Sequence, residues 1–205
     1  MQKQIFDTQY EENYARLTLK YIYPKTHFNF ICDDKPDIQN NVEKIGIEVT
    51  IATSEHEAIS NAFFNKICGK NLSIKEITQL ALKMYHCKNK EELPCYVNDG
   101  VFSPSKGLIT PAAFLQNIIN ASKSKQAKMD NYNKESWKQI GLYLFTLMYF
   151  EEYEIISILP ELVVSSDFDF YIINVLGDLY YIHKNAKYNK YIISDDDLKI
   201  FKKNA

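Results

Sequence analysis

Two acidic residues in one short segment have the spacing to hold a cation. The segment Lys35–Thr50, KPDIQNNVEKIGIEVT, reads as a β-hairpin with Asp37 before its turn and Glu48 after it. Whether the turn comprises residues 42–43 or 41–44, the pairing places Asp37 directly opposite Glu48. Opposite residues on paired strands have Cβ atoms about 5 Å apart, and like charges there destabilise the pair. A bound cation would remove that repulsion.

The second strand of this hairpin has two different faces. Alternation places Gly46, Glu48 and Thr50 on one face, and the glycine leaves room beside the acids. The other face carries four apolar residues and is expected to pack on the core: Ile45, Ile47, Val49 and Ile51. Carboxylate oxygens suit Mg²⁺, which can activate a water for attack on phosphorus. The alternative is that this face of the hairpin is exposed to solvent and that both acids extend into the solvent.

The sequences PDI and GIEVT resemble the bipartite motif of the PD-(D/E)xK phosphodiesterases, the restriction-endonuclease-like superfamily. The resemblance implies a metal-dependent nuclease in which Asp37, Glu48 and the Val49 carbonyl bind Mg²⁺ or Mn²⁺. It also implies that water activated by the metal attacks the phosphodiester. Thr50 departs from the pattern, because the family has a lysine there that orients the water.

The threonine at position 50 leaves two hypotheses open for the function of the chain. Either a lysine from elsewhere replaces the missing one, as variants of the superfamily allow, and Thr50 lies beside the attacking water. Or the chain is a catalytically degenerate nuclease-fold protein that binds nucleic acid or a protein partner.

The segment IINASKSKQAKMDNY offers replacement lysines. Lys125, Lys128 and Tyr132 follow at i, i+3 and i+7, which is one face of a helix. Lysines ahead of an apolar strand resemble the arrangement in small bacterial and phage nuclease-like proteins. We therefore expect Lys125 or Lys128 to act in catalysis and Tyr132 to contact substrate. The alternative is a solvated basic face.

Three further residues are weaker candidates. Lys66 and Lys70, on the preceding predicted helix, could reach a substrate phosphate or simply be surface residues. The family core begins with a helix that often supplies another metal-binding glutamate. In YEENYARL this would be Glu12 rather than Glu11, and the alternative is a solvated acid favoured by the helix dipole.

The elements that must position these residues follow from periodicity and capping signals. We expect helices at about 8–23, 55–70, 73–87 and 110–131, and a short one after Ser194. We expect strands at 27–34, in the hairpin, and within 139–149, 167–176 and 178–184. This order predicts an α/β fold with a mixed central β-sheet flanked by helices. The resemblance adds a restriction-endonuclease-like core, within one nuclease-like domain at 1–205 and with a long loop at about 88–109.

Composition limits the class of protein and the kinds of binding partner that we expect. The chain has 205 residues, a formal net charge of −2 and 46% hydrophobic residues, which fits an ordinary globular protein. Its four cysteines show no Cys-x-x-Cys spacing, and we expect free thiols. No segment reads as a signal peptide or bilayer span, so we expect a cytoplasmic protein without a membrane partner. From the resemblance we expect nucleic acid as the partner, with DNA favoured over RNA, and a homodimer is allowed.

Overall fold

The structure is a computed structural model, and it divides the chain into two compact units. Unit 1 comprises Met1–Ala52 and Leu115–Ala205, and unit 2 comprises Thr53–Phe114. The single domain expected from the sequence stays a prediction. The structure describes residues 8–53, 59–60, 62–63, 66–67, 69–93, 96–98, 101–103, 111–129, 136–146, 148–164 and 166–205.

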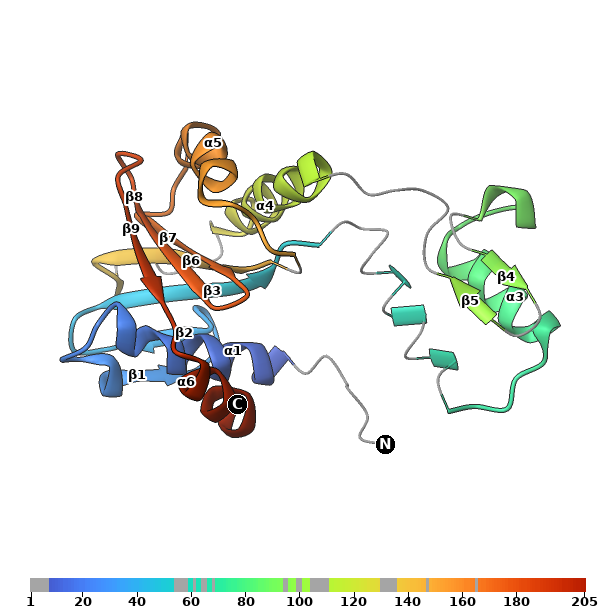
Figure 1. Cartoon of the computed structure of the whole chain (residues 1–205), viewed down its shortest axis with the longest axis horizontal. Coiled ribbons are helices and arrows are strands. Elements are labelled where there is room, and N and C mark those ends of the chain that lie inside the picture. Colours follow the sequence, from blue (N-terminus) through green and yellow to red (C-terminus); the bar gives the residue numbers. More distant parts are fainter. Residues whose placement is uncertain are drawn as a thin grey trace. The chain divides into compact units, whose positions relative to one another are not determined.

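Unit 1 is built on a seven-stranded mixed sheet in the order β1-β2-β3-β6-β7-β8-β9 (Figure 1). The central pairs β3·β6 and β6·β7 are parallel, and the remaining pairs are antiparallel. The strands are β1 (Phe30–Cys32), β2 (Ile38–Asn40), β3 (Ile45–Ile51), β6 (Gln139–Phe145), β7 (Phe170–Val175), β8 (Asp178–His183) and β9 (Tyr188–Ile192). The predicted mixed sheet is thus confirmed.

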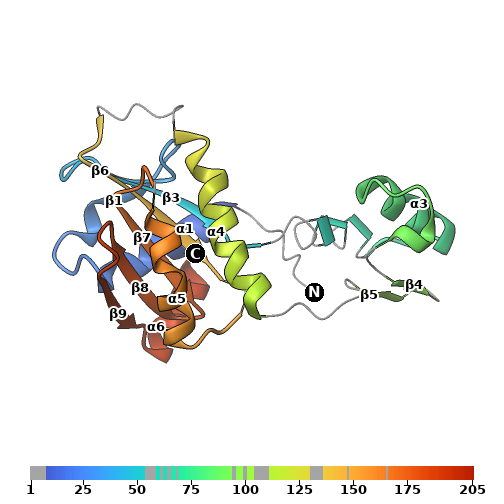
Figure 2. The ribbon, with the colours of Figure 1, turned by 90° about the horizontal axis from the view of Figure 1, so that it is seen from above.

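Helices cover both faces of this sheet, as the sequence predicts (Figures 1 and 2). Helices α1 (Thr8–Thr18) and α6 (Asp195–Asn204) lie on one face, and α4 (Pro111–Gln126) and α5 (Glu152–Val163) lie on the other. The main core lies under α1 and α6. It includes Tyr14, Leu19, Ile38, Ile45, Ile47, Val49, Tyr143, Phe170, Ile172 and Phe201.

The sequence patterns account for these elements. The residues of β3 alternate between apolar and polar because only one face of the strand packs under α1. Strands β6 and β7 lie in the centre of the sheet, and their residues are nearly all apolar. Helix α1 continues into the 3₁₀ turn η1 (Leu19–Tyr21), close to the end expected at Pro24. Ser194 caps α6 by accepting a hydrogen bond from the Asp197 N–H, as expected.

Two elements of unit 1 were not predicted. Helix α5 connects the parallel strands β6 and β7, and such a connection needs a crossover segment. The sequence of α5 lacks the usual helix signals, because Pro160 lies inside the helix and the capping box uses Glu151 in place of serine or threonine. Strand β9 was missed because YNKYI at the sheet edge has little apolar alternation. Helix α4 ends at Gln126, about five residues before the predicted end.

Unit 2 contains helix α3 (Ile74–Met84), whose capping box between Ser73 and Glu76 confirms the prediction. A small core surrounds it: Phe63, Ala81, Tyr85 and Leu93. Of the helix predicted at about 55–70, residues 59–60, 62–63 and 66–67 are helical, and most of the others lie outside the described residues.

The long loop predicted at about 88–109 is wrong in part. Its described residues form the 3₁₀ turn η3 (Lys90–Glu92) and an antiparallel pair, β4 (Tyr96–Asn98) with β5 (Val101–Ser103). The Asp99-Gly100 pair in the sequence between these strands is a strong hairpin signal that the other turn residues obscured.

Two predictions from composition can be compared with the described residues. Cys32 and Cys87 are free thiols there, while Cys68 and Cys95 lie outside the described residues. Among the described helices, none combines the length and the apolar character needed to cross a bilayer.

Candidate functional site

The hairpin has the predicted register. Ile38 pairs with Ile47 and Asn40 pairs with Ile45, so Asp37, one residue before Ile38, falls opposite Glu48. The turn is fixed by the side chain of Asn40. Its Oδ1 accepts hydrogen bonds from the backbone N–H of Val42 at 3.1 Å and of Glu43 at 3.0 Å.

The Asp37 carboxylate replaces a bond of the sheet ladder. The recorded pairing of β2 with β3 stops at Ile47, and the N–H of Val49 donates to Oδ2 of Asp37 at 2.7 Å. A side chain thus satisfies a backbone donor that the short strand β2 does not reach. The aspartate is thereby held against the strand that carries Glu48.

The missing side chain of Gly46 makes room for the ring of Pro36. Gly46 lies two residues before Glu48, on the same face of β3, and the ring of Pro36 packs directly over it. A Cβ on Gly46 would also meet Cδ2 of Trp137 at 3.4 Å. The only tryptophan of the chain therefore lies beside Gly46, which precedes Glu48 by two residues on β3.

Lys125 of α4 lies between the two acids. Its Nζ is 2.8 Å from Oε2 of Glu48 and 3.4 Å from Oδ2 of Asp37. Burial by itself lowers the pKa of Lys125, but the two carboxylates more than offset this effect and hold its pKa above the usual value. The ammonium therefore remains charged at neutral pH and neutralises one of the two negative charges.

Glu48 is the most buried member of the site, with 1% of its surface exposed. Its Oε2 is bonded to Lys125, whereas its Oε1 is buried and has no hydrogen-bond partner in the described part of the chain. Leaving a buried polar atom unsatisfied costs about 1–3 kcal/mol, and more when the group is charged. Such an oxygen is available to a ligand other than the described residues.

A buried hydrogen-bond group fixes α4 against the sheet. The hydroxyl of Tyr171 on β7 lies 3.1 Å from that of Ser122, one helical turn before Lys125. The same hydroxyl lies 2.5 Å from that of Ser166, which also accepts the N–H of Phe168. Burial raises the pKa of Tyr171, so its phenol stays neutral. This group holds the lysine-bearing turn of α4 at a defined height above β3.

The other predicted site residues are placed as follows. Thr50 is half-buried and shares the face of Glu48, where it pairs with Leu144. Val49 contributes its N–H to Asp37, a role that the sequence analysis did not assign. Glu12 is on α1, and α1 packs on the opposite face of the sheet from Glu48.

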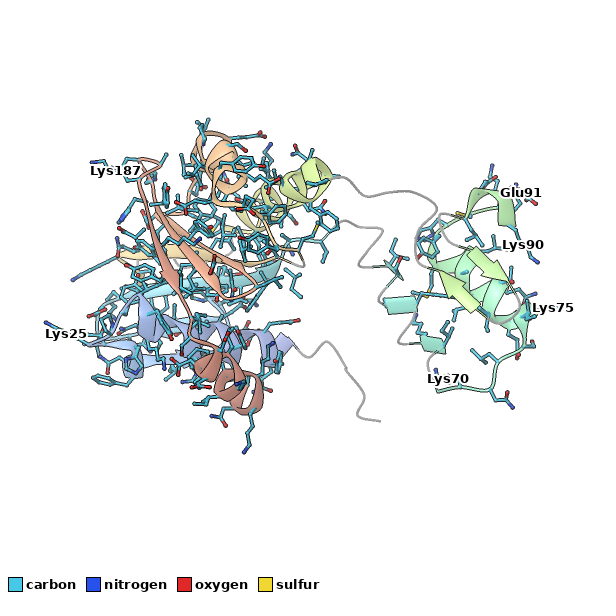
Figure 3. The ribbon with its side chains drawn as sticks, viewed as in Figure 1. Lys25, Lys70, Lys75, Lys90, Glu91 and Lys187 are labelled. Carbon is cyan, nitrogen blue, oxygen red and sulfur yellow. The ribbon has the colours of Figure 1, made fainter. Side chains whose placement is uncertain are left out.

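Four predicted binding residues are not part of the described site. Lys128 is exposed beyond the end of α4, because the helix stops at Gln126, and Tyr132 lies outside the described residues. Lys66 and Lys70 are exposed residues of unit 2, and Lys70 is labelled on its surface in Figure 3. Lys125 and Lys128 therefore do not lie on one continuous α-helix.

Sequence reasoning missed four contributors: Pro36, Trp137, Ser122 and Tyr171. Two of them carried a signal: Ser122 precedes Lys125 by three residues on a helix, and Pro36 belongs to the PDI segment. Nothing in the sequence pairs Ser122 with Tyr171, which lies 49 residues away.

The described residues include no group of three or more His, Cys, Asp or Glu side chains placed to hold a metal ion. Comparisons with protein-family models, with curated proteins and with solved structures found no match.

Proposed function

We propose that this chain is a metal-dependent phosphodiesterase that cleaves nucleic acid and has a restriction-endonuclease-like core in unit 1. One observation carries the proposal: two carboxylates, Asp37 and Glu48, converge with Lys125, and one Glu48 oxygen is buried without a partner among the described residues. The order of elements supports it, since a helix precedes the hairpin and the lysine-bearing helix precedes the parallel strand β6.

The donor atoms fit a hard divalent cation. Asp37, Glu48 and the Val49 carbonyl are oxygen donors, which Mg²⁺ and Mn²⁺ prefer. When bound, the ion would polarise a water and neutralise charge on the phosphate. Oε1 of Glu48, which has no partner in the part of the chain that the structure describes, is the donor open to such an ion.

The chain's own residues would perform the remaining tasks. Lys125 carries a positive charge on a fixed helix turn and can stabilise the charge that develops on the phosphate oxygens. Lys125 would thus replace the lysine that the family motif has at the position of Thr50. Glu48 and Asp37 hold the ammonium in place, and Trp137 offers an aromatic surface near the site on which a base could stack.

Cleavage assays test this function. Purified wild-type protein is incubated with duplex DNA, single-stranded DNA and RNA in Mg²⁺ or Mn²⁺, beside Glu48→Gln and the matched control Glu161→Gln. Glu161 is an exposed acid that pairs with Lys123. We expect Glu48→Gln to lose more than about 100-fold in rate, since even outer-shell residues of metal sites contribute 10–100-fold. Equal rates in all three proteins would refute the proposal.

One observation favours the second candidate, a degenerate nuclease fold that binds nucleic acid or a protein without cleaving. Lys125 already bridges the acid pair, so the site is partly neutralised without a metal. Calorimetric titration separates the two candidates. Absence of Mn²⁺ binding at millimolar concentration, together with retention of DNA or RNA in a gel-shift assay, would support the binding role.

A further inference from the structure

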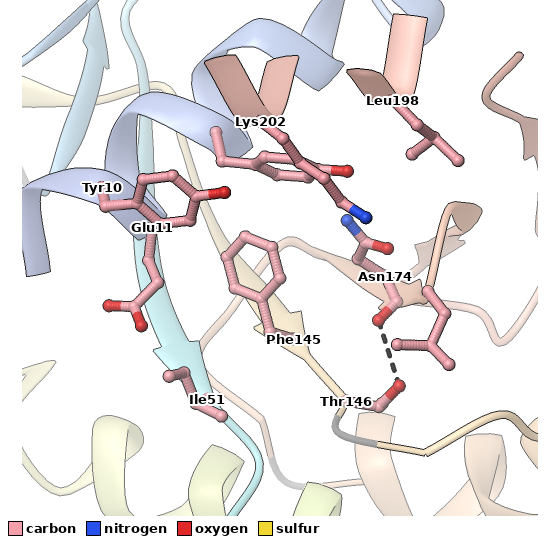
Figure 4. A pocket seen from close by; sticks show the side chains of 10 residues that line it. Tyr10, Glu11, Ile51, Phe145, Thr146, Asn174, Leu198 and Lys202 are labelled. Atoms are coloured by element: carbon pink, nitrogen blue, oxygen red, sulfur yellow. Dashed lines mark hydrogen bonds between the residues drawn. The ribbon is translucent and has the colours of Figure 1, made fainter. Parts of the chain in front are cut away.

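A cavity of unit 1 lies at the carboxyl ends of its parallel strands (Figure 4). Ile51 at the end of β3, Phe145 and Thr146 at the end of β6, and Asn174 near the end of β7 line it. In open sheets, crevices outside the carboxyl ends of parallel strands are frequent ligand sites. Helices α1 and α6 close this cavity from the face opposite to Glu48, so it is separate from the acid pair.

The cavity measures about 410 Å³, which is within the range of about 300–1,000 Å³ of small-molecule sites. Its wall is mainly apolar and aromatic: Tyr10, Tyr14, Ile51, Phe145, Leu176 and Leu198. The rings of Tyr14 and Phe145 meet edge to face, with centroids 5.8 Å apart. Leu176 is 60% exposed and Tyr10 is 40% exposed, so the apolar wall is open to solvent.

The polar atoms at the base of the cavity are already bonded within the protein. Asn174 donates through Nδ2 to the Tyr143 hydroxyl at 2.8 Å and accepts the Gly177 N–H at 2.9 Å. The Thr146 hydroxyl donates to the Met148 carbonyl at 2.9 Å. These bonds make the base rigid, and they leave recognition to the apolar wall and to charged groups.

The charged group that remains is Lys202 of α6. Its ammonium points into the cavity beside Asn174 in Figure 4. Lys202 forms no ion pair with any of the described residues. Glu11, which also lines the cavity, has an interaction partner. An apolar wall with an ammonium that forms no ion pair among the described residues complements a molecule that has an apolar body and one anionic group.

We propose that this cavity binds a small amphipathic anion, namely an aromatic or aliphatic carboxylate whose hydrocarbon part lies against Tyr14 and Phe145. The carboxylate lies at the ammonium of Lys202. This site is independent of the proposed nuclease function, because no residue of the acid pair contributes to it.

Calorimetric titration with 2-naphthoate, and with the uncharged 2-naphthamide as a matched ligand, tests the proposal. We expect saturable naphthoate binding with a Kd below about 1 mM and binding of the amide at least about tenfold weaker. Lys202→Met should weaken naphthoate binding about tenfold and leave binding of the amide unchanged. The control Lys203→Met removes an adjacent exposed charge that does not line the cavity and should bind naphthoate like the wild type.

A second variant places the binding in the cavity. Leu198→Trp fills part of the cavity and should abolish naphthoate binding while the circular dichroism spectrum remains that of a folded protein. Two results would each overturn the proposal: naphthoate binding that is equal in wild type, Lys202→Met and Leu198→Trp, or no saturable binding in the wild type up to about 10 mM.

Discussion

The Nζ of Lys125 lies 2.8 Å from Oε2 of Glu48, although 77 residues separate the two in the sequence. Glu48 comes from a strand in the middle of the sheet, and Lys125 comes from the last turn of the helix above it. The pair is well shielded from water, since 20% of the Lys125 side chain and 2% of the Glu48 side chain are exposed. Its energetics are therefore those of a buried ion pair.

Removing Lys125 should destabilise the fold. Lys125→Met leaves Glu48 as a buried charge without its cation, which typically costs about 3–5 kcal/mol of unfolding free energy. The double variant Glu48→Gln/Lys125→Met should recover much of that loss. Urea denaturation of the wild type and of both variants measures the loss and its recovery. The control Lys123→Met removes an exposed pair and should cost less than about 1 kcal/mol; a similar loss in this control would contradict the assignment.

Lys125 should compete with a divalent cation for the acid pair. A cation bound at Oε1 of Glu48 would be repelled by the ammonium bonded to Oε2, so Lys125→Met should bind Mn²⁺ about tenfold more tightly than the wild type, for a gain of about 1.4 kcal/mol. Calorimetry measures the affinity, and the fluorescence of Trp137, the only tryptophan, reports changes near Gly46. Tighter binding in Lys123→Met as well would show that general charge, and not this contact, is responsible.

The contact between Ser122 and Tyr171 should be energetically coupled. Tyr171→Phe and Ser122→Ala each remove one partner of a buried hydrogen bond, so each should cost about 1–2 kcal/mol of unfolding free energy. In a double-mutant cycle the coupling energy should be about 1 kcal/mol. Additive losses would mean that this hydrogen bond does not hold α4 on the sheet.

The free energy of unfolding should fall at alkaline pH. Burial raises the pKa of Tyr14 to about 12, from 10.0 for an ordinary phenol. As the pH rises, the unfolded chain therefore releases this proton before the folded chain does. The contribution of Tyr14 to the free energy of unfolding is unchanged below about pH 10 and falls between about pH 10 and 12. Lys125 contributes in the same direction, because its pKa is also raised.

Tyr14→Phe should make this decline shallower, by at most about 1.4 kcal/mol per pH unit. Urea denaturation at a series of pH values measures the slope. The control Tyr149→Phe removes a phenol that is 56% exposed and should leave the slope as in the wild type. Identical slopes in Tyr14→Phe and the wild type would exclude Tyr14 as a source of the decline.

Gly46→Ala should destabilise the hairpin. The added methyl group would collide with the ring of Pro36, which is buried, and would crowd Trp137 at 3.4 Å. Overpacking of this kind costs about 1–3 kcal/mol. The same change should shift the Trp137 emission spectrum. Unaltered stability together with an unaltered spectrum would show that the contact with Pro36 yields without cost.

Local patterns in the sequence determined much of unit 1. The alternation of residues 45–51 and the turn after Asn40 were sufficient to predict the register that sets Asp37 opposite Glu48, because register in a hairpin follows from turn length and from which face is apolar. The apolar run from Ile140 predicted the central strand β6, and Ser73 and Ser194 predicted helix starts, because caps are local hydrogen bonds.

Only the tertiary structure decided which lysine reaches the acids and what surrounds them. Lys125 and Lys128 were equivalent by spacing, but α4 stops at Gln126 and only Lys125 contacts the carboxylates. The placement depends on packing between distant segments, such as Tyr171 against Ser122, which no local pattern encodes. The sequence by itself determined the acid pair, and long-range packing determined its counter-charge.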